Sequence, residues 1–234
     1  MNKKKAIAVS LVTIILATML FGCSPTPEDR AKEYLTKYDD TFTLTDKTEN
    51  NGSNTYFFTS QKYPGETVSV HYEGAFEALG SEPFSDNYAS LMLKEEGLKK
   101  GSELTESAFP EMTYDICESR GEYSNYFNKD TTFDTFYAAQ GAYYGVVLYK
   151  TVSEDELNAD SEKLQEVLLG EKDAVQMTTA KLGFKVYYYP ENAEKVSFSN
   201  YTDFDKLSGY DAVLNVEYKK SKDECEVTEM EIVK

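Results

Sequence analysis

The chain has 234 residues and a formal net charge of −17, with 41 acidic side chains against 24 basic ones. Its length suits one domain or two small ones. A surface this acidic repels phosphate backbones and anionic lipid headgroups, so we expect no nucleic-acid partner and no membrane docking driven by charge.

The first 23 residues have the pattern of a secretion signal. Three lysines at positions 3–5 precede a mostly apolar run over residues 6–21, and Gly22 stands directly before Cys23. The run is shorter than the ~20 residues that a helix needs to cross a bilayer. A basic start, a short apolar run and a small residue at the cleavage site predict a signal peptide over residues 1–22.

The residues Leu20-Phe21-Gly22-Cys23 resemble the lipobox of bacterial lipoproteins, although Phe21 stands where that motif usually has a smaller residue. The resemblance implies that the Cys23 thiol receives a diacylglyceryl group and that cleavage makes Cys23 the new N-terminus. It also implies an extracytoplasmic protein, held at the outer face of the cell membrane by a lipid anchor with acyl chains such as palmitate. Two acyl chains anchor a protein stably, whereas one gives only reversible binding. The alternatives are an uncleaved membrane anchor and a plain signal peptide in which Cys23 is incidental. Either would explain the apolar run but not the Gly22-Cys23 pair at its end.

Cleavage after Gly22 leaves 212 residues, and the loss of three lysines changes the net charge from −17 to −20. Residues 23–27 are short, polar and rich in proline, which is typical of a tether. We expect residues 28–234 to form a single α+β domain, because no linker of Pro, Gly and Ser divides them. The alternative is two units that meet near residues 150–155.

The first predicted helix begins directly after the tether. Thr26 is a suitable N-cap and Pro27 a suitable first helical residue. An apolar stripe at helical spacing follows, formed by Ala31, Tyr34, Leu35 and Tyr38.

Three strands are then expected to form an antiparallel meander against this helix. They cover residues 42–45, 54–59 and 68–72, with turns at Asn51-Gly52 and Pro64-Gly65. The helix followed by Phe57-Phe58-Thr59-Ser60 and Tyr63-Pro64-Gly65-Glu66 resembles small uncharacterised lipoproteins of Gram-positive bacteria. That resemblance covers only the first part of the mature chain and implies no activity.

A second helix is predicted to begin at Ser85 or Asp86, and Gly97 and Gly101 are both candidate ends for it. A fourth strand follows near residues 112–116, and the periodicity of residues 133–138 is ambiguous between helix and strand.

Residues 143–149 are apolar at every position, which predicts a strand buried on both faces. Ser153 and Glu156 have the spacing of a capping box and open a third helix that ends near Gly170. The last strands are expected over residues 183–189, 211–218 and 225–233. These elements predict an α+β fold, a mostly antiparallel sheet with about three helices packed on it.

Two cysteines remain besides Cys23. Cys117 and Cys225 could form a disulfide in an exported protein, or each could stay a thiol on its own strand. The spacing does not decide between these two states.

No motif for catalysis, metal binding or cofactor binding is present in the sequence. His71 is the only histidine, and alternation places it on the polar face of its strand. One histidine and two separated cysteines cannot supply the three or four ligands of a zinc site. We therefore predict no catalytic residues, no metal ligands and no cofactor. A pair of carboxylates for glycoside hydrolysis remains open, because the sequence does not single out two acids from 41.

The chain has 19 tyrosines and no tryptophan. If the strand at 183–189 exposes one face, Tyr187 and Tyr189 form a strip of two rings beside Lys185, which suits recognition of a glycan or peptide. The other interpretation is that these tyrosines pack in the core, since tyrosine is a good strand former.

These observations favour a lipid-anchored binding or interaction module of the cell envelope, with a glycan, a peptide or a membrane protein as its partner. The first alternative is a cell-envelope hydrolase that uses a carboxylate pair. The second is an accessory subunit of a membrane complex. An aromatic-lined pocket would favour the binding module, and two facing carboxylates would favour the hydrolase. A flat apolar patch would favour the accessory subunit.

Overall fold

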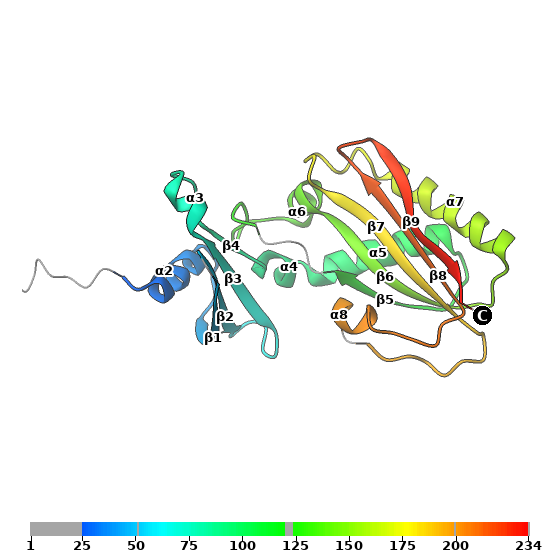
Figure 1. Cartoon of the computed structure of the whole chain (residues 1–234), viewed down its shortest axis with the longest axis horizontal. Coiled ribbons are helices and arrows are strands. Elements are labelled where there is room, and N and C mark those ends of the chain that lie inside the picture. Colours follow the sequence, from blue (N-terminus) through cyan, green and yellow to red (C-terminus); the bar gives the residue numbers. More distant parts are fainter. Residues whose placement is uncertain (1–24, 51, 120–123, 199, 234) are drawn as a thin grey trace, which may run out of the picture.

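The computed structural model describes residues 25–50, 52–119, 124–198 and 200–233. It confirms an α+β fold, in which the described strands form two sheets rather than one. A four-stranded sheet lies toward one end of an elongated molecule and a five-stranded sheet toward the other, and α4 lies between them and leads into α5 (Figure 1).

The four-stranded sheet begins with the predicted helix and meander. Thr26 caps α2 through a capping box with Asp29, and Ala31 of the helix and Leu35 of the turn after it are buried against the sheet. Sheet order is β1-β2-β3-β4, and all pairs are antiparallel. The elements are α2 (Pro27–Tyr34), a 3₁₀ turn (Leu35–Lys37), β1 (Phe42–Asn50), β2 (Ser53–Ser60), β3 (Thr67–Glu73), α3 (Gly74–Ala78) and β4 (Phe84–Asp86).

The predicted start and end of the second helix were wrong. Ser85 and Asp86 belong to β4, which adds a strand to the meander. Two helices follow, α4 (Tyr88–Met92) and α5 (Lys94–Ala108), and α5 continues through Gly97 and Gly101. Both glycines face the five-stranded sheet, where a larger side chain would collide with it. They therefore allow close packing of α5 on the sheet and do not mark the end of the helix.

The five-stranded sheet has the order β5-β6-β7-β8-β9. Only β6 and β7 are parallel, and α7 makes the crossover connection that a parallel pair requires. Its elements are β5 (Tyr114–Ser119), α6 (Phe133–Gln140), β6 (Gly141–Tyr149), α7 (Glu154–Gly170), β7 (Lys181–Tyr189), α8 (Tyr201–Phe204), β8 (Ala212–Lys219) and β9 (Glu224–Ile232).

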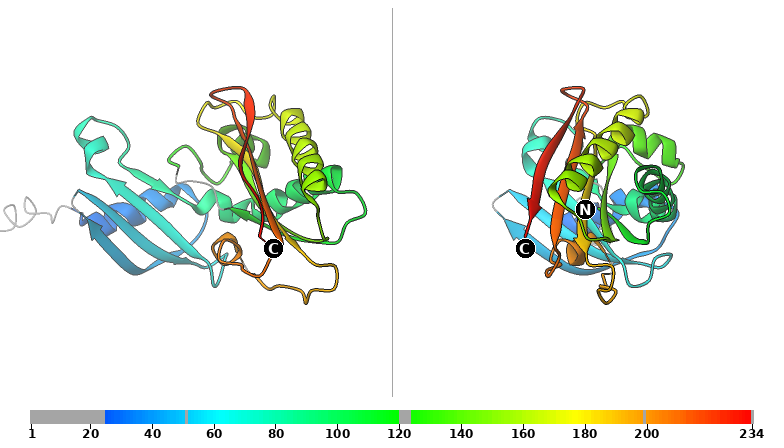
Figure 2. Two further views of the ribbon diagram at one scale, coloured as in Figure 1. Left: turned by 45° about the vertical axis from the view of Figure 1, so that its right-hand side comes forward. Right: turned by 90° about the vertical axis from the view of Figure 1, so that its right-hand side faces the viewer.

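Both faces of this sheet are covered. Helices α5 and α7 pack on one face, and the connection from β7 to β8, which contains α8, lies over the other (Figure 2). The predicted strand at 143–149 is the interior strand β6, and Val146, Val147 and Leu148 have no exposed surface. The capping box of Ser153 and Glu156 opens α7 as predicted.

The change from one sheet to the other does not fall near residues 150–155. That segment joins β6 to α7 within the five-stranded unit, whereas the sheets change between β4 and β5. The two units are tied together at Asp86, whose backbone pairs with that of Ser124, and at Tyr34, whose hydroxyl donates to the Ser124 carbonyl at 3.3 Å. Within the four-stranded unit, Lys37 forms a 2.7 Å ion pair with the buried Asp86 carboxylate.

Cys117 and Cys225 do not form a disulfide. They lie on β5 and β9, the two opposite edges of the five-stranded sheet. Four strand spacings separate those edges, roughly 19 Å, whereas a disulfide needs Cα atoms within ~7 Å of each other.

The predicted signal peptide, the lipobox and Cys23 lie outside the described residues. None of the described helices combines the length and the hydropathy that a membrane-spanning segment needs.

Candidate functional site

The candidate site is a cleft bordered by α5, α6 and the segment that follows α7. Helix α5 divides into two faces. Its residues Gly97, Gly101, Leu104, Thr105 and Ala108 are buried at helical spacing against the sheet. The polar residues Glu96, Lys99, Lys100 and Glu103 follow the same spacing on the side that borders the cleft.

Helix α6 supplies two aromatic rings. Thr132 caps it by accepting a hydrogen bond from the Thr135 amide at 3.3 Å. Phe133 and Tyr137, four residues apart, share one side of the helix, and their ring centroids are 5.4 Å apart. Phe136 turns to the other side and packs on Phe127.

The third wall follows the end of α7. The amide of Gln176 donates to the carbonyl of Ala138 at 2.8 Å, which holds the 171–177 segment against α6. This contact places Glu171 and Ala174 at the cleft, opposite the polar side of α5.

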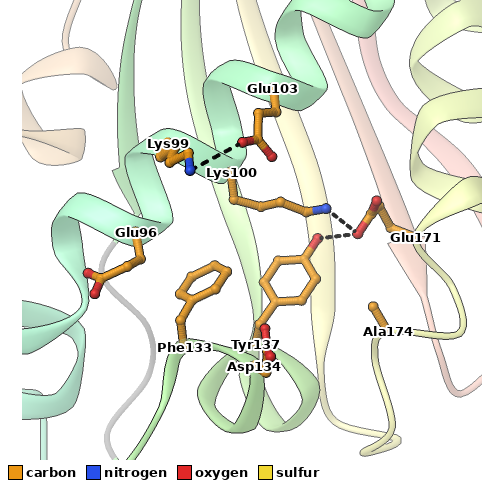
Figure 3. A pocket seen from close by; sticks show the side chains of 9 residues that line it. All are labelled: Glu96, Lys99, Lys100, Glu103, Phe133, Asp134, Tyr137, Glu171 and Ala174. Atoms are coloured by element: carbon orange, nitrogen blue, oxygen red, sulfur yellow. Dashed lines mark hydrogen bonds and ion pairs between the residues drawn. The ribbon is translucent and has the colours of Figure 1, made fainter.

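The cleft has a volume of about 360 Å³, and Figure 3 shows how its side chains meet. Lys100 reaches across from α5 to Glu171, with 2.9 Å between Nζ and Oε2. Tyr137 Oη donates to the same Glu171 oxygen at 3.4 Å, and Lys100 Nζ lies 5.7 Å from the Tyr137 ring centroid. The volume of the cleft is in the range of small-ligand sites, ~300–1,000 Å³.

Charge is distributed unevenly between the floor and the rim of the cleft. On the floor, burial and the nearby Glu171 carboxylate raise the pKa of Tyr137 well above its usual value, so its hydroxyl keeps its proton. The rim carries exposed side chains, Glu96, Lys99, Glu103 and Asp134. The lining contains four acids and two lysines, a balance of −2 that favours a cationic ligand.

The tyrosine strip expected on β7 is not exposed. Tyr187 and Tyr189 are only 3% and 4% exposed, because the segment between β7 and β8 folds over them. Tyr210 stacks on Tyr187 at 4.3 Å between ring centroids, and the Ser208 carbonyl accepts a hydrogen bond from Tyr189 Oη. The recognition strip was therefore the wrong interpretation, and core packing is the right one.

Lys185 is also unavailable for a ligand in this arrangement. Its side chain is 16% exposed and pairs with Asp205 at 2.8 Å and Glu229 at 3.7 Å. The ammonium therefore serves to join β7 to α8 and to β9.

A second feature is the half-buried Glu118 on β5. It lies against α5, where a Cβ at Gly97 would be 2.2 Å from Glu118 Oε2. Removal of water by burial raises the pKa of Glu118 to about 8, and the nearby Lys94 only partly offsets this. Glu118 borders two small cavities of about 210 Å³ and 70 Å³.

A raised carboxyl pKa is typical of a general acid, but a second carboxylate is not suitably placed. Glu217 is the other acid that lines the 210 Å³ cavity. It lies on β8, three strand spacings or roughly 14 Å from β5, and its side chain points to the opposite face of the sheet from Glu118. Glycosidases hold their two carboxyl groups ~5–10 Å apart. The geometry therefore gives little support to a carboxylate-pair hydrolase.

The described residues contain no cluster of three or more His, Cys, Asp and Glu side chains that could hold a metal ion. His71 lies on β3 in the other sheet, where its Nδ1 is 3.1 Å from Thr55 Oγ1 and its Nε2 is 3.5 Å from Glu73. The histidine and the cleft thus belong to different units.

None of the cleft residues was predicted from the sequence. They come from three segments far apart in the chain, and each segment by itself has only the charge pattern of a solvated helix face. The one local signal was the ambiguous segment 133–138, whose pair Phe133 and Tyr137 has helical spacing.

The chain was compared with models of protein families, with curated proteins and with solved structures, and none of them matches it.

Proposed function

We propose that this chain is a lipid-anchored binding module of the cell envelope and that the cleft between α5 and α6 is its ligand site. The observation that carries the ligand site is the cleft itself, where two aromatic rings and a fixed ion pair form the floor and exposed charges form the rim. Such a combination of apolar surface and a few placed polar groups is typical of small-ligand sites.

The ligand that fits this chemistry is a peptide segment with a cationic side chain. Four carboxylates against two ammonium groups favour positive charge, and the rings of Phe133 and Tyr137 can hold a cation over their faces. Lys100 already occupies such a position over Tyr137, and Lys99 pairs with Glu103 at 3.9 Å. This leaves the Phe133 ring and the rim acids Glu96 and Asp134 for a ligand.

The binding proposal is tested with a short peptide of alternating alanine and lysine, measured by calorimetry. Phe133→Ala should weaken its binding roughly five- to tenfold, because an aromatic contact to a cation contributes ~1 kcal/mol. Tyr126→Ala, which removes a ring that is 74% exposed outside the cleft, is the matched control and should leave binding unchanged. Higher salt should weaken binding, since the rim charges are exposed.

Two results would contradict this assignment. One is equal binding of a peptide in which glutamate replaces lysine. The other is a preference for an N-acetylglucosamine oligomer, which would make the ligand a glycan.

The anchor part of the proposal rests on the sequence Leu20-Phe21-Gly22-Cys23, which ends three residues before α2 begins. Cys23→Ser should release the protein from the membrane or leave it unprocessed. Mass spectrometry of the N-terminus of the purified protein measures this directly. An unmodified Met1, or a Cys23 without lipid on protein isolated from cells, would overturn the anchor.

A cell-envelope hydrolase is the second candidate, and the observation that favours it is the half-buried Glu118, whose carboxyl pKa is raised to about 8. A protonated carboxyl at neutral pH could donate a proton to a leaving group. If the chain releases sugars or peptides from a cell-wall preparation, Glu118→Gln should abolish that release. Activity that survives this substitution would remove Glu118 from the mechanism.

A further inference from the structure

The turn formed by α3 and the residues after it projects from the four-stranded sheet and exposes large apolar side chains. Every residue from 75 to 82 is exposed. Phe76 is 52% and Leu79 is 80% exposed, and the latter is the highest exposure among the large apolar side chains described. Single exposed apolar residues are common on proteins, so the location of this pair decides its meaning.

The turn lies beside the start of α2. Arg30 is in the first turn of that helix, and its Nη2 is 2.8 Å from Glu77 Oε1 on α3. Arg30 also lies over the ring of Phe84, 5.5 Å from its centroid. Figures 1 and 2 place the start of α2 and the α3 turn at the same end of the molecule, away from the five-stranded sheet.

Chain length limits how far this end can be from a bilayer. Four residue steps separate Cys23 from Pro27, the first residue of α2. Fully extended, they span at most roughly 14 Å. The headgroup layer on each side of a bilayer is itself ~5–7 Å thick. A lipid on Cys23 would therefore hold the start of α2, and the α3 turn beside it, close to the headgroups.

Charge on the turn does not oppose this contact strongly. Residues 74–82 contain two acids, Glu77 and Glu82. The Glu77 carboxylate is offset by Arg30 and also accepts a hydrogen bond from Tyr72 Oη. The rest of the turn is apolar or small, which suits shallow insertion at a membrane interface.

We propose that the α3 turn, through Phe76 and Leu79, is a membrane-contacting surface that inserts into the bilayer to which Cys23 anchors the chain. This inference rests on the anchor in the proposed function and is independent of the ligand assigned to the cleft. It gives the four-stranded unit a role in setting how the molecule stands on the membrane.

The natural lack of tryptophan makes a direct test possible. The full chain carrying Leu79→Trp, purified with its N-terminus as processed in cells, is placed in vesicles of phosphatidylcholine and phosphatidylglycerol with brominated acyl chains. The matched control is Met230→Trp on β9, where the native side chain is 44% exposed in the five-stranded unit. We expect the tryptophan at position 79 to shift its emission to the blue and to lose most of its intensity to bromine quenching. The control should do neither.

Flotation of the vesicles and the mass of the N-terminus, measured on the same sample, separate the possible failures. If the lipidated protein floats and the tryptophan at position 79 stays as unquenched as that at position 230, the contact is overturned and the anchor stands. A blue shift without bromine quenching would place the turn against protein, for example a second copy, and would also overturn the contact. If the chain carries no lipid and does not float with the vesicles, both the proposed anchor and the proposed membrane contact are overturned.

Discussion

The two sheets of this molecule differ in how they meet solvent. In β2, an interior strand of the four-stranded sheet, three residues of eight are buried, whereas seven of nine are buried in β6, an interior strand of the five-stranded sheet. The first sheet rests on α2 and presents its edge strand and the α3 turn to the outside. The second is enclosed between α5 and α7 on one face and the β7–β8 connection on the other.

This difference in burial fits the two roles proposed above, ligand binding and membrane contact. An enclosed sheet is a rigid support, because its strands and helices are held by close packing on both sides. It suits the positioning of a ligand cleft on its surface helices. A sheet with an open side and a projecting turn can meet a large flat partner such as a membrane. Substitutions in the two units should therefore have unequal effects.

The largest difference is expected from a charge placed in each sheet. Val147 on β6 is fully buried beside Tyr187 and Phe204, so Val147→Asp buries an unpaired carboxylate and should cost at least ~4 kcal/mol or prevent folding. Thr48→Asp on the exposed β1 should cost less than ~1 kcal/mol. Urea unfolding of both variants measures this contrast. If Val147→Asp melts like the parent, β6 is not enclosed.

Truncation of a large side chain gives the next contrast. Tyr187→Ala removes a ring that is packed between Tyr210 and Phe204, and large aromatic truncations in cores cost ~3–5 kcal/mol. Leu79→Ala on the α3 turn should change stability by no more than ~0.5 kcal/mol in solution. A melting temperature of Tyr187→Ala close to that of the parent would return the tyrosine strip to consideration.

The half-buried Glu118 predicts a dependence of stability on pH within the five-stranded unit. Its pKa is about 8 in the folded chain and ~4.3 when unfolded, so the folded state holds a proton that the unfolded state loses. Stability should therefore fall as pH rises from about 4.3 to about 8, by a few kcal/mol at ~1.4 kcal/mol per pKa unit.

Glu118→Gln removes that titration, and the comparison with the parent cancels the contribution of the other acids. The variant should match the parent near pH 4 and exceed it in stability by a few kcal/mol at pH 9. Chemical denaturation at the two pH values is the measurement. If the difference in unfolding free energy between the variant and the parent is the same at both pH values, Glu118 is not desolvated.

The smallest contrast concerns two helical glycines in the five-stranded unit. A Cβ at Gly101 on α5 would lie 2.5 Å from the Tyr144 ring, so Gly101→Ala should cost ~1–3 kcal/mol by overpacking. A Cβ at Gly170 on α7 meets nothing within 4 Å, and Gly170→Ala should stabilise the chain by ~0.5–1 kcal/mol. Thermal melts of the two variants should move in opposite directions. A stabilised Gly101→Ala would show that α5 does not approach the sheet closely.

What could be predicted from the sequence was what local physics determines. The N-cap at Thr26 and the capping box of Ser153 and Glu156 mark two helix starts through neighbouring residues, and the alternating strands of the meander were found from their own pattern. The burial of β6 followed from a run that is apolar on both faces.

What could not be predicted depends on distant partners. Helix α5 runs through Gly97 and Gly101 because Glu118 and Tyr144 fill the space that the missing side chains leave. Tyr187 and Tyr189 are buried because the segment from 190 to 211, which is polar for much of its length, carries Phe204 and Tyr210 onto them. The cleft could not be found because its walls come from three separate segments.

We propose that the five-stranded unit binds the ligand while the four-stranded unit meets the membrane. Hydrogen–deuterium exchange of the full chain, with and without vesicles and with and without the alanine–lysine peptide, tests both parts. The peptide should slow exchange in α6 and in residues 171–177 and leave residues 74–81 unchanged, whereas the vesicles should slow exchange at 74–81 and leave α6 unchanged. If the peptide slows exchange in α3, or fails to slow it in α6 at saturating concentration, the proposed division of roles between the two units is wrong.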